Sequence, residues 1–238
     1  MSLFRKLWLK TRIELEFLFR ERLNLIPPHP GSIWKSAIRP YLHEGGHIVD
    51  AGAHVGADSV ELARLFPFTT VHAFEPVPEI FHMLVRNTRR HKNIRCYNIA
   101  LSDADRRDFL HVSSGASDAS SSLLEPEQVL VDHPDVRFER TIEVSCRSLD
   151  SWAKAYSIRG IAFLWLDLQG LELRVLRASE SVLAEVRAVH AEVSLRRTYS
   201  SVALYPELRE WMASRGFAVG REAIPAGTDM GNVLFVRS

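Results

Sequence analysis

A regular alternation of short apolar runs with helix-like stretches begins at residue 47 and constrains the fold more than any other feature. The apolar runs predict strands at 47–52, 70–75, 94–101, 160–168 and 188–195, and two further strand pieces at 216–220 and 232–236. The intervening patterns predict helices at 56–66, 78–91, 171–186 and 205–216. Strands that alternate with helices at this spacing lie parallel and are joined by right-handed crossovers. The sequence therefore predicts an α/β fold, in which an open and mostly parallel sheet carries helices on both faces.

The run at 160–168, GIAFLWLDL, is almost entirely apolar, as expected of a central strand that is buried on both faces. The irregular interval before it, of about 60 residues, is long for a connection within a compact domain. Within this interval, residues 136–150 end in a stretch that alternates like a half-exposed strand. Insertions beside the carboxyl edge of a sheet often shape a substrate site. We therefore expect the interval to contribute to binding; the alternative is a surface excursion without a role.

The first 26 residues have the pattern of an amphipathic helix that ends at a cluster of prolines. Its apolar stripe comprises Leu15, Leu18, Phe19 and Leu23, and Pro27, Pro28 and Pro30 follow. We predict two parts in the chain, an N-terminal helical extension over residues 1–46 and a main domain over residues 47–238. The extension is expected to pack on the domain or on a second subunit of a homo-oligomer, because interspersed glutamates disfavour a membrane-surface helix.

The charge balance argues against a partner that is held by bulk electrostatics. Lys and Arg number 30 and Asp and Glu 29, which gives a net charge of +1, and a protein that binds nucleic acid normally carries more positive charge. No apolar run approaches the roughly 18–20 residues of a membrane span, and the N-terminus lacks the uninterrupted apolar core of a signal peptide. Two cysteines, Cys96 and Cys146, are too few for a disulfide framework. These features predict a cytoplasmic protein with reduced thiols that acts on a small molecule.

The most informative motif is VDAGAHVGADSVELA, which begins at Val49 and places Asp50, Gly52 and Gly56 at the turn from the first strand into the first helix. Gly52 permits a tight turn with close approach of a ligand, and Gly56 permits close packing of helix and strand. His54 stands where the second glycine of a dinucleotide-binding loop would be, which leaves less room for a diphosphate. The carboxylate of Asp50 favours a cationic ligand.

A second acidic residue follows at the end of the next predicted strand, where VHAFEP places Glu75. An acid at this distance from the glycine loop is positioned to accept both hydroxyls of a ribose, although acids also favour helix N-termini for electrostatic reasons. Ala100 to Asp103 would form the next loop along the same edge, where an adenine ring would lie. A ribose acid without a diphosphate loop, together with a spare carboxylate, fits S-adenosylmethionine, whose sulfonium is positively charged.

In this order, the segments VDAGAHVGADSVELA, VHAFEPVPEIFHMLVRN, NIALSD, SSSLLEP, SLDSWA, FLWLDLQGLELRVLRA and GNVLFV resemble the FkbM-type methyltransferases over residues 47–238. The resemblance implies a Rossmann-like class I methyltransferase sheet, S-adenosylmethionine as cofactor, and methylation of a hydroxyl on a sugar, glycolipid or polyketide-type acceptor. The positions that it implies for cofactor binding are Asp50, Gly52, Gly56, Ser59, Glu75, Ala100 and Asp167. Asp167 matches the acid of the family motif D-x-E/Q-G-x-E, and the neutral amide of Gln169 speaks against its acting as an acid or a base.

An aliphatic hydroxyl is a weak acid, so a hydroxyl acceptor requires a base or a metal ion. Asp167 and Glu192 end predicted adjacent strands at the carboxyl edge of the sheet, and His54 lies in the glycine loop, so these three are the candidate catalytic residues. His190 is more simply a buried histidine of the sheet. The candidate residues could also bind a divalent ion, and the sequence leaves a metal site undecided.

Two further groups lie near the predicted site. Ser120, Ser121 and Ser122 match a family segment beside the site, with a polar linker as the alternative, and Arg196, Arg197 and Tyr199 could face the acceptor. Two other functions stay open: a nicotinamide-dependent oxidoreductase, which the missing G-x-G-x-x-G motif weakens, and a nucleoside-binding module without catalysis.

Overall fold

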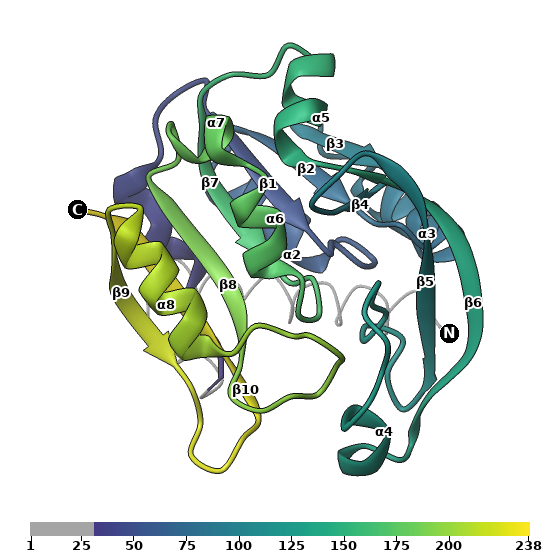
Figure 1. The fold of residues 1–238 in the computed structure, drawn as a ribbon. Helices are drawn as coiled ribbons and strands as arrows, with labels where there is room; N and C mark the ends of the chain where they lie inside the picture. Colours follow the sequence, from purple (N-terminus) through teal and green to yellow (C-terminus); the bar gives the residue numbers. More distant parts are fainter. Residues whose placement is uncertain (1–30) are drawn as a thin grey trace, which may run out of the picture.

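The fold is organised around a seven-stranded sheet in the order β3-β2-β1-β7-β8-β10-β9 (Figure 1). The computed structural model describes residues 31–238, so the helix predicted over residues 1–26 lies outside the described residues. The strands of this sheet are β1 (His47–Ala51), β2 (Thr70–Phe74), β3 (Ile94–Tyr97), β7 (Ile161–Leu166), β8 (Ala188–Ser194), β9 (Phe217–Ala223) and β10 (Met230–Arg237). β10 is antiparallel to its neighbours β8 and β9, and the strands from β3 to β8 are parallel. The predicted mostly parallel α/β sheet is confirmed.

Helices cover both faces of this sheet, as predicted. One face carries α2 (Ala57–Leu65), α3 (Pro78–Thr88) and a 3-10 helix (Lys35–Tyr41). The other face carries α5 (Leu149–Ala155), α6 (Glu172–Arg177), α7 (Glu180–Leu183) and α8 (Tyr205–Ser214). All residues of β7 are buried, which agrees with its apolar sequence and its central place. Among residues 31–238, no helix combines the length and the apolar character that crossing a bilayer requires.

The long interval between the third and fourth predicted strands forms a second, smaller sheet, in the order β4-β6-β5. Its strands are β4 (Ala100–Leu101), β5 (Arg106–Gly115) and β6 (Val136–Arg147), and the short helix α4 (Val129–Asp132) lies between β5 and β6. The alternating pattern before residue 150 corresponds to β6, whereas β5 has too many polar residues to stand out as an apolar run. The interval is therefore ordered, and Figure 1 shows the β5–β6 pair beside the carboxyl edge of the main sheet.

The predicted strand at 94–101 is wrong in its second half, because the chain leaves the main sheet after Tyr97. The side-chain amide of Asn98 donates hydrogen bonds to the carbonyl oxygens of Glu75 and Pro76, at 2.8 and 3.0 Å. These contacts turn the chain so that Ala100 and Leu101, which form β4, pair with β6 of the small sheet. A single polar residue thus ends one strand and begins another.

The helix predicted over 171–186 is in fact two short helices, α6 and α7. The carboxylate of Asp150, which belongs to α5, accepts hydrogen bonds from the backbone N–H groups of Ser181 and Val182 at 2.9 and 2.8 Å. Ser179 donates its hydroxyl to the carbonyl oxygen of Val175 at 2.5 Å. A carboxylate that satisfies free N–H groups starts a new helix, so a residue distant in sequence sets this break.

An aromatic cluster around Trp152 packs α5 against β2 and β3 at the edge of the main sheet. The indole lies edge-on to the rings of Phe74, His72 and Tyr97, with centroids 4.9, 5.0 and 5.2 Å away, and its side chain is fully buried. Such edge-to-face contacts add to the hydrophobic gain of burying a large side chain.

Replacement of Trp152 by Ala is expected to lower the free energy of unfolding by about 3–5 kcal/mol, because it removes a large fully buried ring. Urea denaturation followed by circular dichroism measures this loss. Tyr156→Ala is the matched control, since this ring also contacts Trp152 but is 49% exposed; its expected cost is about 1 kcal/mol. Equal losses for the two variants would contradict the assignment of Trp152 as the centre of the cluster.

Candidate active site

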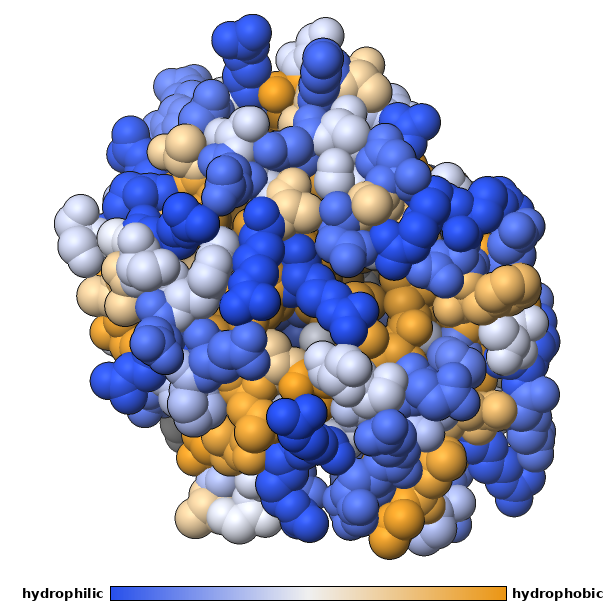
Figure 2. Space-filling model, in the orientation of Figure 1, coloured by the Kyte–Doolittle hydropathy of each residue, from blue (hydrophilic) through white to orange (hydrophobic). Residues whose placement is uncertain are grey.

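A cavity of about 220 Å³ lies where β1, β2 and β7 end at the carboxyl edge of the main sheet. Gly52 to His54 follow β1, Glu75 and Pro76 follow β2, and Asp167 to Gln169 follow β7. Leu110 of β5 also lines the cavity, and so do five residues of the segment that follows β5: Asp118, Ala119, Ser121, Ser122 and Leu123. The face of the molecule seen in Figure 2 is largely hydrophilic, and apolar residues show between charged ones near its centre.

Gly52 allows the turn after β1 to touch the end of β7. Its φ of +83° lies in the left-handed region, and a Cβ at this position would lie 1.9 Å from the carbonyl oxygen of Asp167. The same turn is tied to β2, because the N–H groups of Gly52 and Ala53 both donate to the carbonyl oxygen of Phe74. No other residue fits this position without moving the backbone. Gly52 lines the cavity, as the sequence predicts.

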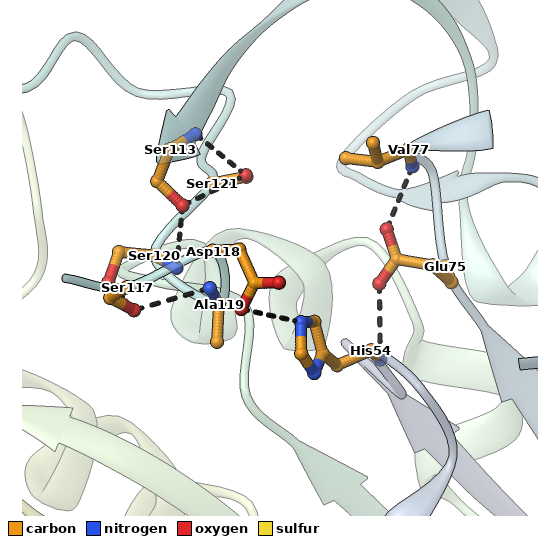
Figure 3. Close-up of polar contacts among 9 residues, drawn as sticks. All are labelled: His54, Glu75, Val77, Ser113, Ser117, Asp118, Ala119, Ser120 and Ser121. Atoms are coloured by element: carbon orange, nitrogen blue, oxygen red, sulfur yellow. Dashed lines mark hydrogen bonds and ion pairs between the residues drawn. The ribbon is translucent and has the colours of Figure 1, made fainter. Parts of the chain in front are cut away.

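The carboxylate of Glu75 is buried and held by the main chain (Figure 3). One oxygen accepts the N–H of His54 at 3.1 Å, and the other accepts the N–H of Val77 at 2.8 Å. Burial raises the pKa of Glu75 to about 7, against the lowering effect of these two hydrogen bonds. Each carboxylate oxygen can accept more than one hydrogen bond, so Glu75 retains acceptor capacity toward the cavity that it lines.

An apolar wall adjoins Glu75 on the side of the second sheet. Ile99, Ala100 and Leu101 line the cavity there, together with Leu110 from β5, which belongs to the same apolar cluster as Ala100. Ala100 lies at the cavity, and its contact with a cofactor stays a prediction. A wall of this kind suits a flat, apolar or aromatic group next to the carboxylate.

His54 reaches across the cavity toward the segment that follows β5. Its Nε2 lies 3.0 Å from Oδ1 of Asp118, and this pair joins the glycine loop to residues 116–122, which we name the serine loop (Figure 3). The loop is braced against β5, because Ser113 Oγ accepts the N–H of Ser120 and Ser121 Oγ accepts the N–H of Ser113. Ser121 and Ser122 line the cavity, so this loop is part of the site.

At the other end of the cavity, Gln169 lies between the two predicted catalytic carboxylates. Its Nε2 donates to Oδ1 of Asp167 and to Oε2 of Glu192, both at 2.8 Å. The hydroxyl of Tyr199 lies 3.2 Å from Oε1 of Gln169 and 2.8 Å from the carbonyl oxygen of Ser120. Asp167 and Gln169 line the cavity, whereas Glu192 lies behind them. Asp167 and Glu192 are therefore linked through the amide of Gln169, to which the sequence had given no role as an acid or a base.

The carboxyl groups of Asp167, Glu192 and Glu172 lie near one another, and this opposes their simultaneous ionisation. Burial raises the pKa of Asp167, and the hydrogen bond from Gln169 opposes this. Burial also raises the pKa of Glu192 well above its ordinary value, and the nearby carboxylates of Asp167 and Glu172 raise it further. Glu172 accepts the N–H groups of Leu168 and Gly170 at 2.7 and 3.4 Å, which fixes the turn after β7.

Three predicted cofactor residues, Asp50, Gly56 and Ser59, do not line the cavity. Asp50 is buried under α2 and accepts a short hydrogen bond from the hydroxyl of Ser59, which is also buried. A Cβ on Gly56 would lie 2.7 Å from Cδ1 of Leu84, so this glycine allows α2 and α3 to pack. Direct ligand contacts for these three residues stay predictions.

The candidate catalytic residues Asp167, Glu192 and His54 are not placed together as ligands of one metal ion. Asp167 and Glu192 meet across Gln169, whereas Nε2 of His54 faces Asp118. Within residues 31–238, no group of three or more His, Cys, Asp or Glu side chains is placed to hold a metal ion.

His190 is a buried histidine of the sheet, as expected. Its ring stacks on Trp165 with centroids 3.5 Å apart, and burial lowers its pKa to about 3. The amine of Lys35 lies 4.9 Å from the centre of the Trp165 ring and pairs with Asp58 at 2.6 Å. Arg196, which could have faced the acceptor, is exposed and pairs with Asp229.

The polar residues Asp58, Asp118 and Gln169 line the cavity, although the sequence assigned none of them a role in binding or catalysis. Asp58 belongs to α2, and only its position two residues after Gly56 connected it with the glycine loop. Asp118 lies in a polar stretch that resembles a linker. The motif around Asp167 contained the signal for Gln169, since a neutral amide between strand-end carboxylates is able to bridge them.

The sheet order and the cavity at its carboxyl edge define the class I methyltransferase fold. The crystal structure of methyltransferase FkbM from Methylobacillus flagellatus KT superposes with a TM-score of 0.57 over 89% of this chain and 48% of that chain, at 14% identity. Residues 50–219 match the model of the methyltransferase FkbM domain, and the chain belongs to this family.

Two relatives show how far the sequence similarity extends. 2-O-methyltransferase NoeI of Sinorhizobium fredii is 30% identical over 157 residues, which cover 64% of this chain and 65% of NoeI. Methyltransferase sdnD of Sordaria araneosa is 23% identical over 250 aligned positions, which cover 95% of this chain and 91% of sdnD. The chain thus matches less than two thirds of the length of NoeI and about half of the FkbM crystal structure.

The buried carboxylate of Asp50 makes the stability of the fold depend on pH. Burial raises its pKa from 3.8 to about 7, so its ionisation destabilises the folded protein as the pH rises through this range. Asp50→Asn removes the ionisation. When the pH is raised from about 5 to about 8.5, we expect the free energy of unfolding of the variant to rise by roughly 2–4 kcal/mol relative to that of wild type.

Urea unfolding of both proteins at the two pH values measures this gain. Asp135→Asn serves as a control, because Asp135 is exposed. If the stability difference between Asp50→Asn and wild type is the same at both pH values, burial does not raise the pKa of Asp50 in the folded protein, and the prediction is wrong.

Proposed function

We propose that the protein is an S-adenosylmethionine-dependent O-methyltransferase that acts on a hydroxyl of a sugar, glycolipid or polyketide-type small molecule. The observation that carries this proposal is Glu75, whose carboxylate is held by two main-chain N–H groups at the rim of the cavity. A carboxylate fixed in this way and still able to accept hydrogen bonds suits the paired hydroxyls of a ribose.

The residues around Glu75 fit an adenosine. The apolar wall of Ile99, Ala100, Leu101 and Leu110 suits the adenine ring next to the ribose carboxylate. On the other side of Glu75, the turn at Gly52 offers backbone that a ligand can approach closely. The side chain of His54 occupies the space in which a dinucleotide-binding loop has its second glycine, and this disfavours a diphosphate.

The far end of the cavity is acidic, as a sulfonium and an amino group require. Asp167 lines it, together with Asp58, which also pairs with Lys35, and Asp118, which also pairs with His54. Fixed negative groups in a partly enclosed cavity attract a cationic ligand more strongly than they would in water. The cavity therefore has an end for adenosine and an end for the charged amino-acid part.

In the reaction, bound S-adenosylmethionine supplies a methyl group on a positively charged sulfur, which leaves as a neutral thioether. The protein has to align the acceptor hydroxyl with this methyl group and remove its proton. Asp167, whose side chain lines the cavity, is the residue that accepts this proton. Glu192 does not line the cavity and is linked to Asp167 through the amide of Gln169. Ser121 and Ser122 of the serine loop offer hydroxyls to a polar acceptor on the facing wall.

The relatives favour a hydroxyl as the acceptor group, since NoeI is described as a 2-O-methyltransferase. A nicotinamide-dependent oxidoreductase is disfavoured by His54 in the glycine loop and by the FkbM family match. A binding module without catalysis is disfavoured by the presence of Asp167 at the cavity and by its link to Glu192 through Gln169.

S-adenosylmethionine and its demethylated product are expected to bind and to raise the melting temperature, because a ligand that binds only the native state stabilises it. Glu75→Gln should weaken this binding by roughly 1–3 kcal/mol, since the amide presents an N–H where hydroxyl donors need an acceptor. Glu79→Gln, an exposed glutamate on α3 that pairs with Arg140, is the matched control and should bind normally. Titration calorimetry measures both. Tight binding of NAD without binding of either sulfur ligand would overturn the proposal.

Catalysis is tested by incubating the protein with labelled S-adenosylmethionine and candidate acceptors, and by identifying the product that gains one methyl group. Asp167→Asn and Glu192→Gln nearly preserve shape, so each tests charge. At least one is expected to turn over about 10²–10⁴ times more slowly, as when a general base is removed, while it binds the cofactor almost normally.

Glu143→Gln, which removes an exposed carboxylate of β6 that pairs with Arg107 away from the cavity lining, controls for a general loss of charge. Wild-type turnover in both Asp167→Asn and Glu192→Gln at saturating cofactor would show that neither carboxylate is the base. A chelator added to the wild type, followed by magnesium or manganese, decides whether a metal ion takes part.

A further inference from the structure

The side chain of Gln169 has every polar atom engaged, and its contacts tie four separate segments together. Its nitrogen lies 2.8 Å from a carboxylate oxygen of Asp167, which follows β7, and 2.8 Å from one of Glu192, which belongs to β8. Its oxygen faces the hydroxyl of Tyr199, which follows β8 and also reaches the serine loop at Ser120. An amide nitrogen has two hydrogens, so both are used on the two carboxylates.

The orientation of this amide follows from the chemistry of its neighbours. The two ionisable carboxyl groups on one side accept hydrogen bonds and therefore face the amide nitrogen. On the other side the amide oxygen lies 3.2 Å from the hydroxyl of Tyr199, and it shares the single hydrogen of this hydroxyl with the nearer carbonyl oxygen of Ser120 at 2.8 Å. The backbone of Gln169 is also held, because Ser122 donates its hydroxyl to the carbonyl oxygen of Gln169 at 3.0 Å. Its φ of +51° is a left-handed conformation that non-glycine residues adopt rarely. Contacts from both sheets thus hold the side chain and the main chain in place.

The two carboxyl groups differ in their surroundings. Asp167 lines the cavity, whereas Glu192 lies behind it and faces the carboxylates of Asp167 and Glu172. Two carboxylates that face each other across one amide resist joint ionisation. The ionisable groups that act on this pair from neighbouring elements are Asp50 of β1, His54 of the glycine loop, Asp58 of α2, Glu172 of α6 and Tyr199 of the segment after β8.

We propose that Gln169 is a positioning residue whose amide orients the carboxyl groups of Asp167 and Glu192 and keeps Asp167 ionised at the cavity. Glu192 then holds the proton that the pair shares, and Asp167 takes the proton of the acceptor hydroxyl as the oxygen–methyl bond forms and the sulfur–methyl bond breaks. The kinetic part of this inference rests on the proposed function. Its structural part, the control of the ionisation of Asp167 by Gln169, does not.

The test compares Gln169→Leu, which removes both donors at similar size, with Gln169→Glu, which removes them and adds a third carboxyl group. Gln128→Leu is the matched control, because Gln128 donates its side-chain amide to Asp132 on α4, among residues that do not line the cavity. For each protein, kcat is measured as a function of pH at saturating S-adenosylmethionine. In parallel, the affinity for S-adenosylmethionine is measured by calorimetry.

Both Gln169 variants are expected to shift the acidic limb of the kcat profile upward by at least about 1 pH unit, because Asp167 loses hydrogen bonds to its ionised form. Turnover of Gln169→Leu should fall at least about tenfold at neutral pH and recover at alkaline pH, with cofactor affinity within about threefold of wild type. The proposal is overturned if turnover falls but the acidic limb of the kcat profile does not shift and turnover does not recover at alkaline pH. Gln169 would then have only a structural role.

A second measurement reads the carboxyl group directly. Asp167 is followed by ¹³C NMR of protein labelled at aspartate carboxyl carbons, with its resonance assigned by its loss in Asp167→Asn. Its titration midpoint should move upward in both Gln169 variants and stay in place in Gln128→Leu. An unchanged midpoint in a folded Gln169→Glu protein overturns the proposal, even if Gln169→Leu does not fold. If the wild type methylates no acceptor, the proposed function fails, and this titration alone still decides the role of Gln169.

Discussion

The contact between Gly52 and the main chain of Asp167 is the constraint on which the candidate site depends. It brings the turn after β1 against the end of β7, so that Glu75, which follows β2, and Asp167, which follows β7, line the same cavity. The turn is also bonded to the end of β2, through the carbonyl oxygen of Phe74. Three parallel strands therefore end at a common point, and a side chain at position 52 would push two of them apart. The chemistry at either end of the cavity depends on this backbone contact.

Much of the fold follows from the sequence because apolar periodicity and burial are directly related. β7 could be placed at the centre from its composition alone, and β6 from its alternating pattern. The places where prediction was wrong are controlled by contacts between residues distant in the chain. Asn98 ends β3 by bonding to residues after β2, and Asp150 starts α7 from a neighbouring helix. Side-chain hydrogen bonds of this kind leave no periodic signal.

In the candidate site, too, some residues could be predicted from the sequence and others could not. Glu75 and Asp167 follow predicted strands, and strand ends at the carboxyl edge meet by topology alone, so their presence at the cavity could be predicted. Asp50 could not be placed in the same way, because every residue of β1 after its first is buried and the strand has no alternation to show which face each side chain takes. In the structure Asp50 shares a row of the sheet with Trp165 and His190, on the face covered by α2. Gln169 acquires its role only when β7 and β8 are side by side.

His54 contributes to the cavity in two independent ways. Its main-chain N–H holds Glu75 on one side, and its ring reaches Asp118 of the serine loop on the other. The N–H comes from the main chain, whose left-handed φ of +48° at His54 disfavours β-branched residues and proline, whereas the contact with Asp118 requires the imidazole. The contact that holds Glu75 therefore depends less on side-chain identity than the contact with Asp118 does. In evolutionary terms, such a division lets a lineage change what it recognises across the cavity while it inherits the carboxylate unchanged.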